Sequence, residues 1–271
     1  MQYMNFNSSC AYCCVANMLE RQGRSVTDVQ LFREMKAEWL LHYDVETGMW
    51  QTGAMLQSGE WFDLALRPMG FSLQETHNAS ADDVLGTKPP FMVGLKTGQG
   101  GRHAHILIKR VGESLTFLNP HREGDGEPDF VTLSRTECDE RLSITSTIGR
   151  LNSCTPREID FRPILNAARE NWHVYQEALT DFISHTHTWE DMMTARDIPF
   201  RALVLDGLEG AKIGGHKEQE ARLRKLQGQF LGALKEKRPL CLSEYLDGED
   251  LAEAFALMCP NPRDLILLPA R

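Results

Sequence analysis

The sequence lacks any long apolar run. No segment approaches the roughly eighteen uninterrupted apolar residues that a helix needs to cross a bilayer. The N-terminal stretch MQYMNFNSS also lacks the basic and the apolar parts of a secretory signal peptide. We therefore expect a protein with no membrane partner.

Cysteine is too sparse for a disulfide framework. The 271 residues include seven cysteines, an odd number, at positions 10, 13, 14, 138, 154, 241 and 259. Scattered thiols of this kind are typical of a reducing compartment, so we expect a cytoplasmic protein. Delivery out of the cell by a dedicated secretion system would leave no trace in the composition.

Basic residues are fewer than acidic ones. The 29 Lys and Arg against 38 Asp and Glu give a formal net charge of −9, which argues against nucleic acid as the main partner. The chain also lacks internal repeats and low-complexity tracts. What remains is an ordinary globular composition, long enough for one large domain or two smaller ones.

Helical patterns come first in the chain, and strand patterns follow. Apolar spacing and cap residues predict helices at 10–22, 25–39 and 59–69, a loop at 42–57, and one or two helical turns at 79–85. Apolar runs bounded by turn residues predict strands at 71–75, 90–95, 105–111, 115–118 and 130–133. Helices followed by an antiparallel sheet make an α+β fold class.

The strand pattern stops near Leu151, and Asn152 to Pro156 (NSCTP) is the expected domain boundary. We therefore expect two domains, 1–152 and 153–271. After the boundary, patterns alternate at 159–183, 201–205, 216–235, 248–258 and 265–268, so the second domain should be a small α/β or mostly helical extension. From its position alone, we interpret it as a substrate-recognition or capping domain.

Cys10 stands at the start of the first predicted helix. Ser8 and Ser9 precede it as good N-cap residues, and Cys14 and Met18 share an apolar face that should pack inside the fold. The helix dipole and the unpaired N–H groups of a first turn favour the thiolate, the nucleophilic form of cysteine. The alternative is that the cysteines of this helix are small buried apolar residues.

A base and an orienting group for Cys10 are available on the predicted hairpin. His105 begins one strand, and Asn119 ends the next. Opposite ends of two antiparallel strands lie side by side, which predicts the Asn119 amide close to the His105 ring. The three residues have the types of a Cys-His-Asn triad.

Residues 1–135 resemble papain-like bacterial thiol enzymes. The string CAYCCVANMLERQG, followed by SVTDVQLF, is similar to their N-terminal motif. The string HILIKRVGESLTFLNP is similar to their strand led by His and the next strand ending in Asp-Pro. Two branches fit best: the bacteriocin-leader peptidases fused to exporters, and the butirosin-type acyltransferases that act on acyl carrier protein.

The resemblance implies a papain-like cysteine-protease fold, in which an N-terminal helix packs on an antiparallel sheet, and no cofactor. By position it makes Cys10 the nucleophile, His105 the base and Asn119 the ring-orienting residue. These branches usually have Asp in place of Asn119, although papain itself has Asn. The implied function is attack on an amide or thioester carbonyl through an acyl-enzyme, most simply as a cysteine peptidase.

Two alternatives to a peptidase stay open. Capture of the acyl group by an amine would make the chain an acyltransferase, and loss of chemistry would leave a papain-like binding module. The expected partner is accordingly a peptide, a protein or an acyl carrier protein. The oligomeric state stays open.

Several amides are candidates for the oxyanion donor. The position of the family's Gln is Met4 here, and Gln2 and Asn5 flank it; we favour Gln2. A second register of the resemblance makes Cys13 the nucleophile and Asn7 the donor. In either register, the backbone N–H of the nucleophile is a further donor.

We prefer Cys10 to Cys13 because only Cys10 keeps the helix length before Gly23. The family often has Gly directly after the nucleophile, where this chain has Ala11.

Metal and redox sites are competing interpretations of the cysteines. Cys10 and Cys13 form a CxxC, and His103 and His105 an HxH, so four zinc ligands can be named. A CxxC inside a helix is, however, unlike a structural zinc knuckle. A thioredoxin-like CAYC would need a preceding strand.

Three other features have less specific patterns. His121 and Asp125 follow Asn119 and are candidate substrate contacts or a replacement orienting group. His185 and His187 favour a solvated helix end over a ligand pair. The stretch from Gly207 to Gly215 lacks a phosphate-binding motif, so we predict a loop.

Overall fold

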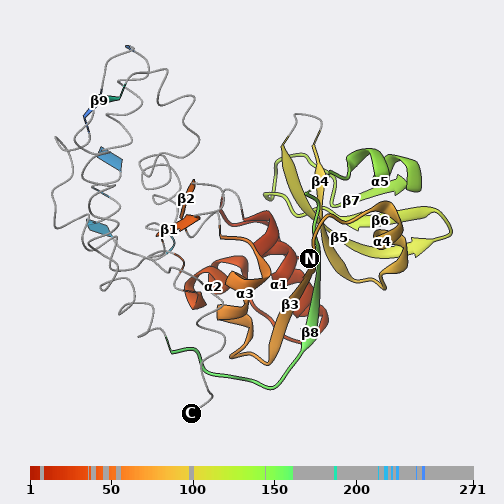
Figure 1. Cartoon of the computed structure of the whole chain (residues 1–271), viewed down its shortest axis with the longest axis horizontal. Helices are drawn as coiled ribbons and strands as arrows, with labels where there is room; N and C mark the ends of the chain where they lie inside the picture. Colours follow the sequence, from red (N-terminus) through yellow and green to blue (C-terminus); the bar gives the residue numbers. More distant parts are fainter. Residues whose placement is uncertain are drawn as a thin grey trace. The chain divides into compact units, whose positions relative to one another are not determined.

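The computed structural model describes residues 1–6, 9–35, 37, 41–44, 49–52, 56–97, 101–143 and 145–160, with a few short stretches after residue 185 (Figure 1). Met1–Met35 and Gln57–Glu158 form one compact unit, and a second unit includes Lys36–Leu56 and Ile159–Pro269. The boundary at residue 152 and the character of the C-terminal extension stay predictions, because most later residues lie outside the described part.

Helix α1 (Cys10–Arg21) begins at the predicted residue. It ends before Gly23, whose φ of 78° is readily adopted only by glycine. Ser9 occupies the predicted N-cap position, but its side chain makes no hydrogen bond to the first turn. Its hydroxyl donates instead to the Asp28 carboxylate at 2.9 Å and to the Phe6 carbonyl oxygen at 2.8 Å.

Helix α2 (Asp28–Glu34) is shorter than the predicted 25–39. A capping box between Thr27 and Gln30 sets its start. Helix α3 (Gly59–Leu66) occupies most of the predicted 59–69. The α1 and α2 helices pack against each other, and α3 packs against strand β3 (Phe71–Thr76).

A six-stranded antiparallel sheet holds the unit together. Its strand order is β3-β8-β4-β5-β6-β7. After β3 the strands are β4 (Phe91–Lys96), β5 (Arg102–Val111), β6 (Ser114–Leu118), β7 (Phe130–Ser134) and β8 (Ile148–Ser153). All five predicted strands are therefore present, and the α+β fold class is confirmed.

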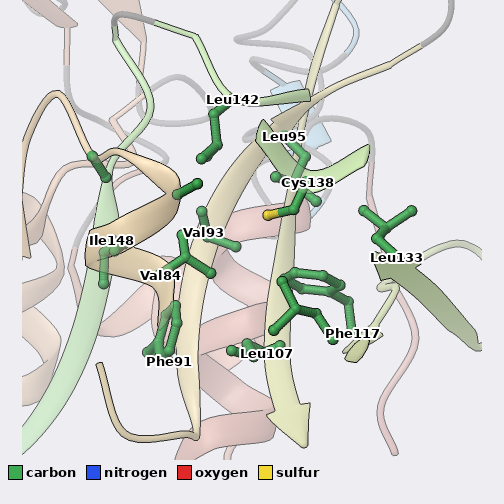
Figure 2. Close-up of a cluster of buried hydrophobic side chains, with 13 residues drawn as sticks. Val84, Phe91, Val93, Leu95, Leu107, Phe117, Leu133, Cys138, Leu142 and Ile148 are labelled. Atoms are coloured by element: carbon green, nitrogen blue, oxygen red, sulfur yellow. The ribbon is translucent and has the colours of Figure 1, made fainter. Parts of the chain in front are cut away.

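One face of the sheet is covered by α4 (Ala81–Gly86) and α5 (Arg135–Arg141). Figure 2 shows the buried side chains of this layer: Val84, Phe91, Val93, Leu95, Leu107, Phe117, Leu133, Cys138, Leu142 and Ile148. Residues at alternating positions, such as the buried Met92 and Ile106, point to the other face. Helix α1 packs against β4, β5 and β8 and lies across the sheet from α4 and α5 (Figure 1).

The sheet contains one strand that was not predicted, and one predicted loop is a hairpin. Strand β8 pairs with both β3 and β4 and ends at Ser153, close to the residue where the strand pattern was expected to stop. Its sequence IGRLNS is half polar, which hid it from an apolar criterion. The predicted loop at 42–57 contains an antiparallel hairpin of β1 (Leu41–Asp44) and β2 (Met49–Thr52).

The predicted helical turns at 79–85 are confirmed as α4, with a capping box from Ser80 to Asp83. Helix α5 was not predicted, although Ser134 and Glu137 form the same kind of box there. In the C-terminal region, the short strands β9 (Thr186–His187) and β10 (Leu240–Cys241) pair antiparallel. No helix in the described part of the chain is long and apolar enough to cross a bilayer.

Candidate active site

Cys10 is the first residue of α1 and is partly exposed. Burial opposes ionisation of its thiol. The hydrogen bond from His103, the positive charge of that ring, and the backbone N–H groups of Ala104 and Ala11 outweigh burial and lower the pKa of Cys10. A thiol with a lowered pKa is present as the nucleophilic thiolate at lower pH than an ordinary cysteine.

Cys13 and Cys14 have the opposite environment. Both are fully buried, and burial raises the pKa of Cys13 to about 12 and that of Cys14 well above its ordinary value. The Cys13 thiol donates to the Gln2 carbonyl oxygen at 3.2 Å and accepts from the Asn17 amide at 3.4 Å. These contacts give Cys13 a structural place and do not favour it as the nucleophile. Asn7, its proposed oxyanion donor, lies outside the described residues.

The histidine that contacts Cys10 is His103. Burial lowers the pKa of His103, but hydrogen bonds with Cys10, the Pro120 carbonyl and the Asn119 side chain raise it overall. The Nε2 atom of His103 lies 2.6 Å from the Pro120 carbonyl oxygen. An N–H at Nε2 donates there, which leaves Nδ1 as the nitrogen available to the thiol.

His105, which the sequence suggested as the base, has different partners. His105 is buried, and its Nδ1 lies 3.1 Å from the His103 carbonyl oxygen. Burial and then the positive charge of His103 lower the pKa of His105 to about 4, so the ring is neutral at neutral pH. Its ring packs edge-on against His103, with centroids 5.0 Å apart.

The extent of strand β5 differs from the prediction. It begins at Arg102, three residues before the predicted start at His105, and its register with β6 shifts between Leu107 and Lys109. Because the two histidines are two residues apart on one strand, they share a face. The sequence signal for His103 was the HxH motif, but the packing of α1 against β5 is needed to choose between its two members.

Asn119 is buried directly after β6 and is fixed at two points. Its backbone N–H donates to the Asp129 carbonyl oxygen at 2.9 Å, and its Nδ2 donates to the Pro128 carbonyl oxygen at 3.0 Å. The side chain hydrogen-bonds with His103. The structure thus brings together Cys10, His103 and Asn119, two of which the sequence named.

The candidate oxyanion donors differ in the hydrogen bonds that they already make. Asn5 is occupied, because its Nδ2 donates to the Asp28 carboxylate at 2.6 Å and to the Tyr3 carbonyl oxygen at 3.3 Å. An amide nitrogen has two hydrogens, so Asn5 has none left for an oxyanion. Gln2 is different.

The backbone of Gln2 is fixed against α1. Its N–H donates to Asn17 Oδ1 at 2.8 Å, and its carbonyl oxygen accepts from Asn17 Nδ2 at 3.1 Å. The side-chain Oε1 of Gln2 is buried without a hydrogen bond within the described part of the chain. Because Oε1 is an acceptor, a donor role in an oxyanion hole would rest on the Nε2 of the same carboxamide.

The zinc interpretation does not fit the geometry. Cys13 and His105 are each engaged with a backbone carbonyl, and His103 is engaged with Pro120. Among the described residues, no group of three or more His, Cys, Asp or Glu side chains is arranged to hold a metal ion. The loop predicted from Gly207 to Gly215 and residue His185 lie outside the described residues, and His187 is in β9.

Comparisons with protein-family models and with curated proteins found no match. Among solved structures, the chain is similar to the peptidase domain of Streptococcus ComA, a bifunctional ABC transporter involved in a quorum-sensing pathway. The TM-score is 0.40 and the identity 13%, over 57% of this chain and 96% of that domain.

The chain is also similar to a candidate C39-like peptidase from Bacillus anthracis, with a TM-score of 0.37 and 16% identity. This alignment covers 54% of this chain and 90% of the other. Both scores are low, and neither likeness identifies the family of the chain.

Proposed function

We propose that the chain is a papain-like cysteine peptidase in which Cys10 is the nucleophile, His103 the base and Asn119 the ring-orienting residue. The observation that carries this proposal is the hydrogen bond between a thiol of lowered pKa and a histidine of raised pKa. Opposite shifts of this kind favour a thiolate–imidazolium pair, the reactive state of such enzymes. The resemblance of residues 1–135 to papain-like thiol enzymes supports the same assignment.

The reaction follows from the positions of these groups. His103 takes the Cys10 proton, and the sulfur adds to the carbonyl carbon of a peptide bond. The imidazolium then gives that proton to the leaving amine as the C–N bond breaks, which leaves a thioester on Cys10. Water, deprotonated by His103, attacks the thioester; a free acid leaves, and the thiol is restored.

The oxyanion of each step needs donors near the sulfur. The first backbone N–H groups of a helix have no partner within that helix, so the N–H of Cys10 is suited to this role. We propose the Gln2 carboxamide as the second donor. Its main chain is hydrogen-bonded to Asn17 and Cys13, which holds Gln2 against α1.

Substitution of the nucleophile and of the base tests the proposal. Cys10→Ala should abolish cleavage of a quenched-fluorescence peptide library, whereas Cys13→Ala, one turn further along α1, should keep it. His103→Gln should reduce kcat/KM by about 10²-fold to 10⁴-fold, the usual contribution of a general base. His105→Gln is the matched control on the same strand face and should reduce kcat/KM far less.

Two results would contradict this assignment. Full cleavage by Cys10→Ala would remove the nucleophile, and a larger loss in His105→Gln than in His103→Gln would restore the other histidine as the base. Iodoacetamide gives an independent measurement, because an activated thiol reacts quickly near neutral pH. An inert Cys10 would favour the binding-module alternative.

An acyltransferase would use the same first step and differ in the second. Capture of the thioester by an amine, instead of water, yields an amide product. Intact-mass measurement after incubation with peptides and with acyl thioesters, with and without an amine acceptor, distinguishes the two. A peptidase releases the free acid, and a transferase releases the amide only when the amine is present.

Three further parts of the proposal concern the whole chain. We propose a peptide or protein substrate, with an acyl carrier protein as the alternative partner. The region after residue 152 is proposed to recognise or cap the substrate. A cytoplasmic, bacterial setting fits the scattered thiols and the resemblance, and stays part of the proposal.

A further inference from the structure

Tyr3, His121 and Asp129 form a cluster, here called the clasp, between the N-terminal segment and the loop after β6. His121 Nε2 lies 3.0 Å from Asp129 Oδ1, and His121 Nδ1 lies 2.8 Å from the Arg122 carbonyl oxygen. The Tyr3 ring meets the His121 ring edge-on, with centroids 5.3 Å apart. The Tyr3 hydroxyl hydrogen-bonds with Asp129.

The hydrogen-bond partners of His121 define its charge. Each ring nitrogen faces an oxygen acceptor, and only the imidazolium has two N–H groups to donate. Burial lowers the pKa of His121, but Asp129, the Arg122 carbonyl and the charge of Asp125 outweigh burial and raise it. The groups facing this ring are thus Tyr3 from the N-terminal segment and acidic residues from the loop, so the clasp contains an ion pair.

The clasp is bonded to both sides of the proposed active site. On one side, the Met4 N–H donates to the His121 carbonyl oxygen at 2.9 Å, two residues after Gln2. On the other side, the Asp129 carbonyl oxygen accepts the Asn119 N–H at 2.9 Å. Movement of His121 or Asp129 would therefore move the segment of the proposed oxyanion donor and the residue that holds His103.

We propose that Tyr3, His121 and Asp129 are positioning residues of the proposed cysteine enzyme. Their ion-paired clasp ties the Gln2 segment to the loop from Asn119 to Asp129 and so keeps His103 oriented toward Cys10. The inference rests on the proposed function. The clasp acts through Asn119 and Met4 and has no role on the substrate itself.

The clasp should depend on pH with a defined sign. Because the pKa of His121 is raised, the imidazolium is kept below that raised pKa and is lost as pH rises through it. Loss of the second N–H breaks one of the two hydrogen bonds of the ring. The clasp should therefore weaken as pH rises.

The test uses the full chain and measures the rate at which iodoacetamide alkylates Cys10 between about pH 6 and pH 9. Asp129→Asn keeps the shape of the side chain and removes its charge. His103 should then be held less firmly, and the midpoint of the alkylation profile should rise by about one pH unit. Below the midpoint, this shift corresponds to about tenfold slower alkylation of Cys10. Glu127→Gln is the matched control, with the same charge change two residues away, and should leave the midpoint unchanged.

Two conservative variants sharpen this test. Asp129→Glu keeps the carboxylate and should restore the midpoint. Tyr3→Phe keeps the ring contact with His121 and loses the hydroxyl, so it should shift the midpoint in the same direction by a smaller amount. If thermal unfolding shows that Asp129→Asn is not folded, two other measurements replace it. These are the alkylation midpoint of Tyr3→Phe and the protonation state of the His121 ring, read from its ¹⁵N shifts in the wild type.

Equal midpoints in Asp129→Asn and Glu127→Gln, with both folded, would overturn the clasp, as would a neutral His121 ring at neutral pH. Failure of the proposed function gives a different result, namely an inert Cys10 in the wild type. In that case, hydrogen exchange of the Met4 and Asn119 amides still tests the clasp, because Asp129→Asn should lower the protection of both. A reactive Cys10 with no change in midpoint or protection would remove the clasp and leave the function in place.

Discussion

His105 is a neutral histidine packed beside one that we expect to be charged. Burial, the charge of His103 and then that of Arg141 lower its pKa, and its Nδ1 donates to the main chain of His103. A neutral ring at this point avoids repulsion with the imidazolium of His103. It also fills the space between His103 and Phe117, whose ring centroid lies 6.3 Å from that of His105.

The depressed pKa of His105 predicts a pH-dependent stability. Its folded value of about 4 lies below the unfolded value of 6.5, so the neutral ring stabilises the fold above the unfolded pKa. This stability is lost as pH falls through the folded value, and the shift corresponds to about 3 kcal/mol. We expect the free energy of unfolding, measured in urea, to fall less between pH 7 and pH 4 in His105→Gln than in the wild type.

The comparison of His105→Gln with the wild type isolates His105. Buried acids such as Asp63 and Glu75 titrate in both proteins alike. Equal pH dependence in His105→Gln and the wild type would mean that His105 titrates normally in the folded chain.

The residue types of the proposed site could be predicted from the sequence, but which histidine contacts Cys10 could not. Helix position and cap residues predicted Cys10 as the first residue of a helix, and the hydrogen bond and the charge of His103 lower its pKa. Asn119 was predicted from its place at the end of a strand. His103 was not singled out, because two histidines on one strand face are equivalent until the packing of α1 against β5 is known.

At the element scale, the contact between α3 and β3 is set by a glycine. A Cβ at Gly59 would lie 2.6 Å from the Leu73 carbonyl oxygen, and β3 is itself paired along its length with β8. The backbone would have to move, so Gly59→Ala should destabilise the chain by about 1–3 kcal/mol. Gly86→Ala, at the end of α4 with open space around it, should be neutral or stabilising by up to about 1 kcal/mol.

Chemical denaturation of the two glycine variants checks this prediction. A Gly59→Ala chain as stable as Gly86→Ala would mean that α3 can slide on β3 at little cost. Alkylation of Cys10 in both variants serves as a control, since neither glycine belongs to the proposed site.

Elements with strong periodicity were predictable, and those held by tertiary pairing were not. Among the predicted strands, β4 is a nearly continuous buried apolar run, and β3 alternates apolar with polar residues. Strand β8 has exposed polar residues and is a strand because it lies between β3 and β4. The β1–β2 hairpin and α5 were missed for a similar reason, since short polar elements carry little periodic signal.

At the scale of the whole molecule, the proposed site belongs to one unit. Cys10, His103, Asn119 and the clasp all lie within Met1–Met35 and Gln57–Glu158, and every hydrogen bond described between them stays inside that unit. The site should therefore form without the region after residue 160. A chain ending at Asp160 is expected to unfold cooperatively and to keep the wild-type midpoint of Cys10 alkylation.

Substrate turnover should separate from thiol chemistry in this shortened chain. If the region after residue 152 recognises the substrate, then KM for a peptide substrate rises on removal of residues 161–271, while the alkylation profile stays unchanged. A change in the alkylation midpoint itself would show that the removed region contributes to the charge balance of Cys10 and His103. An unchanged KM would leave the proposed recognition role without support, because the catalytic unit would then select its substrate alone.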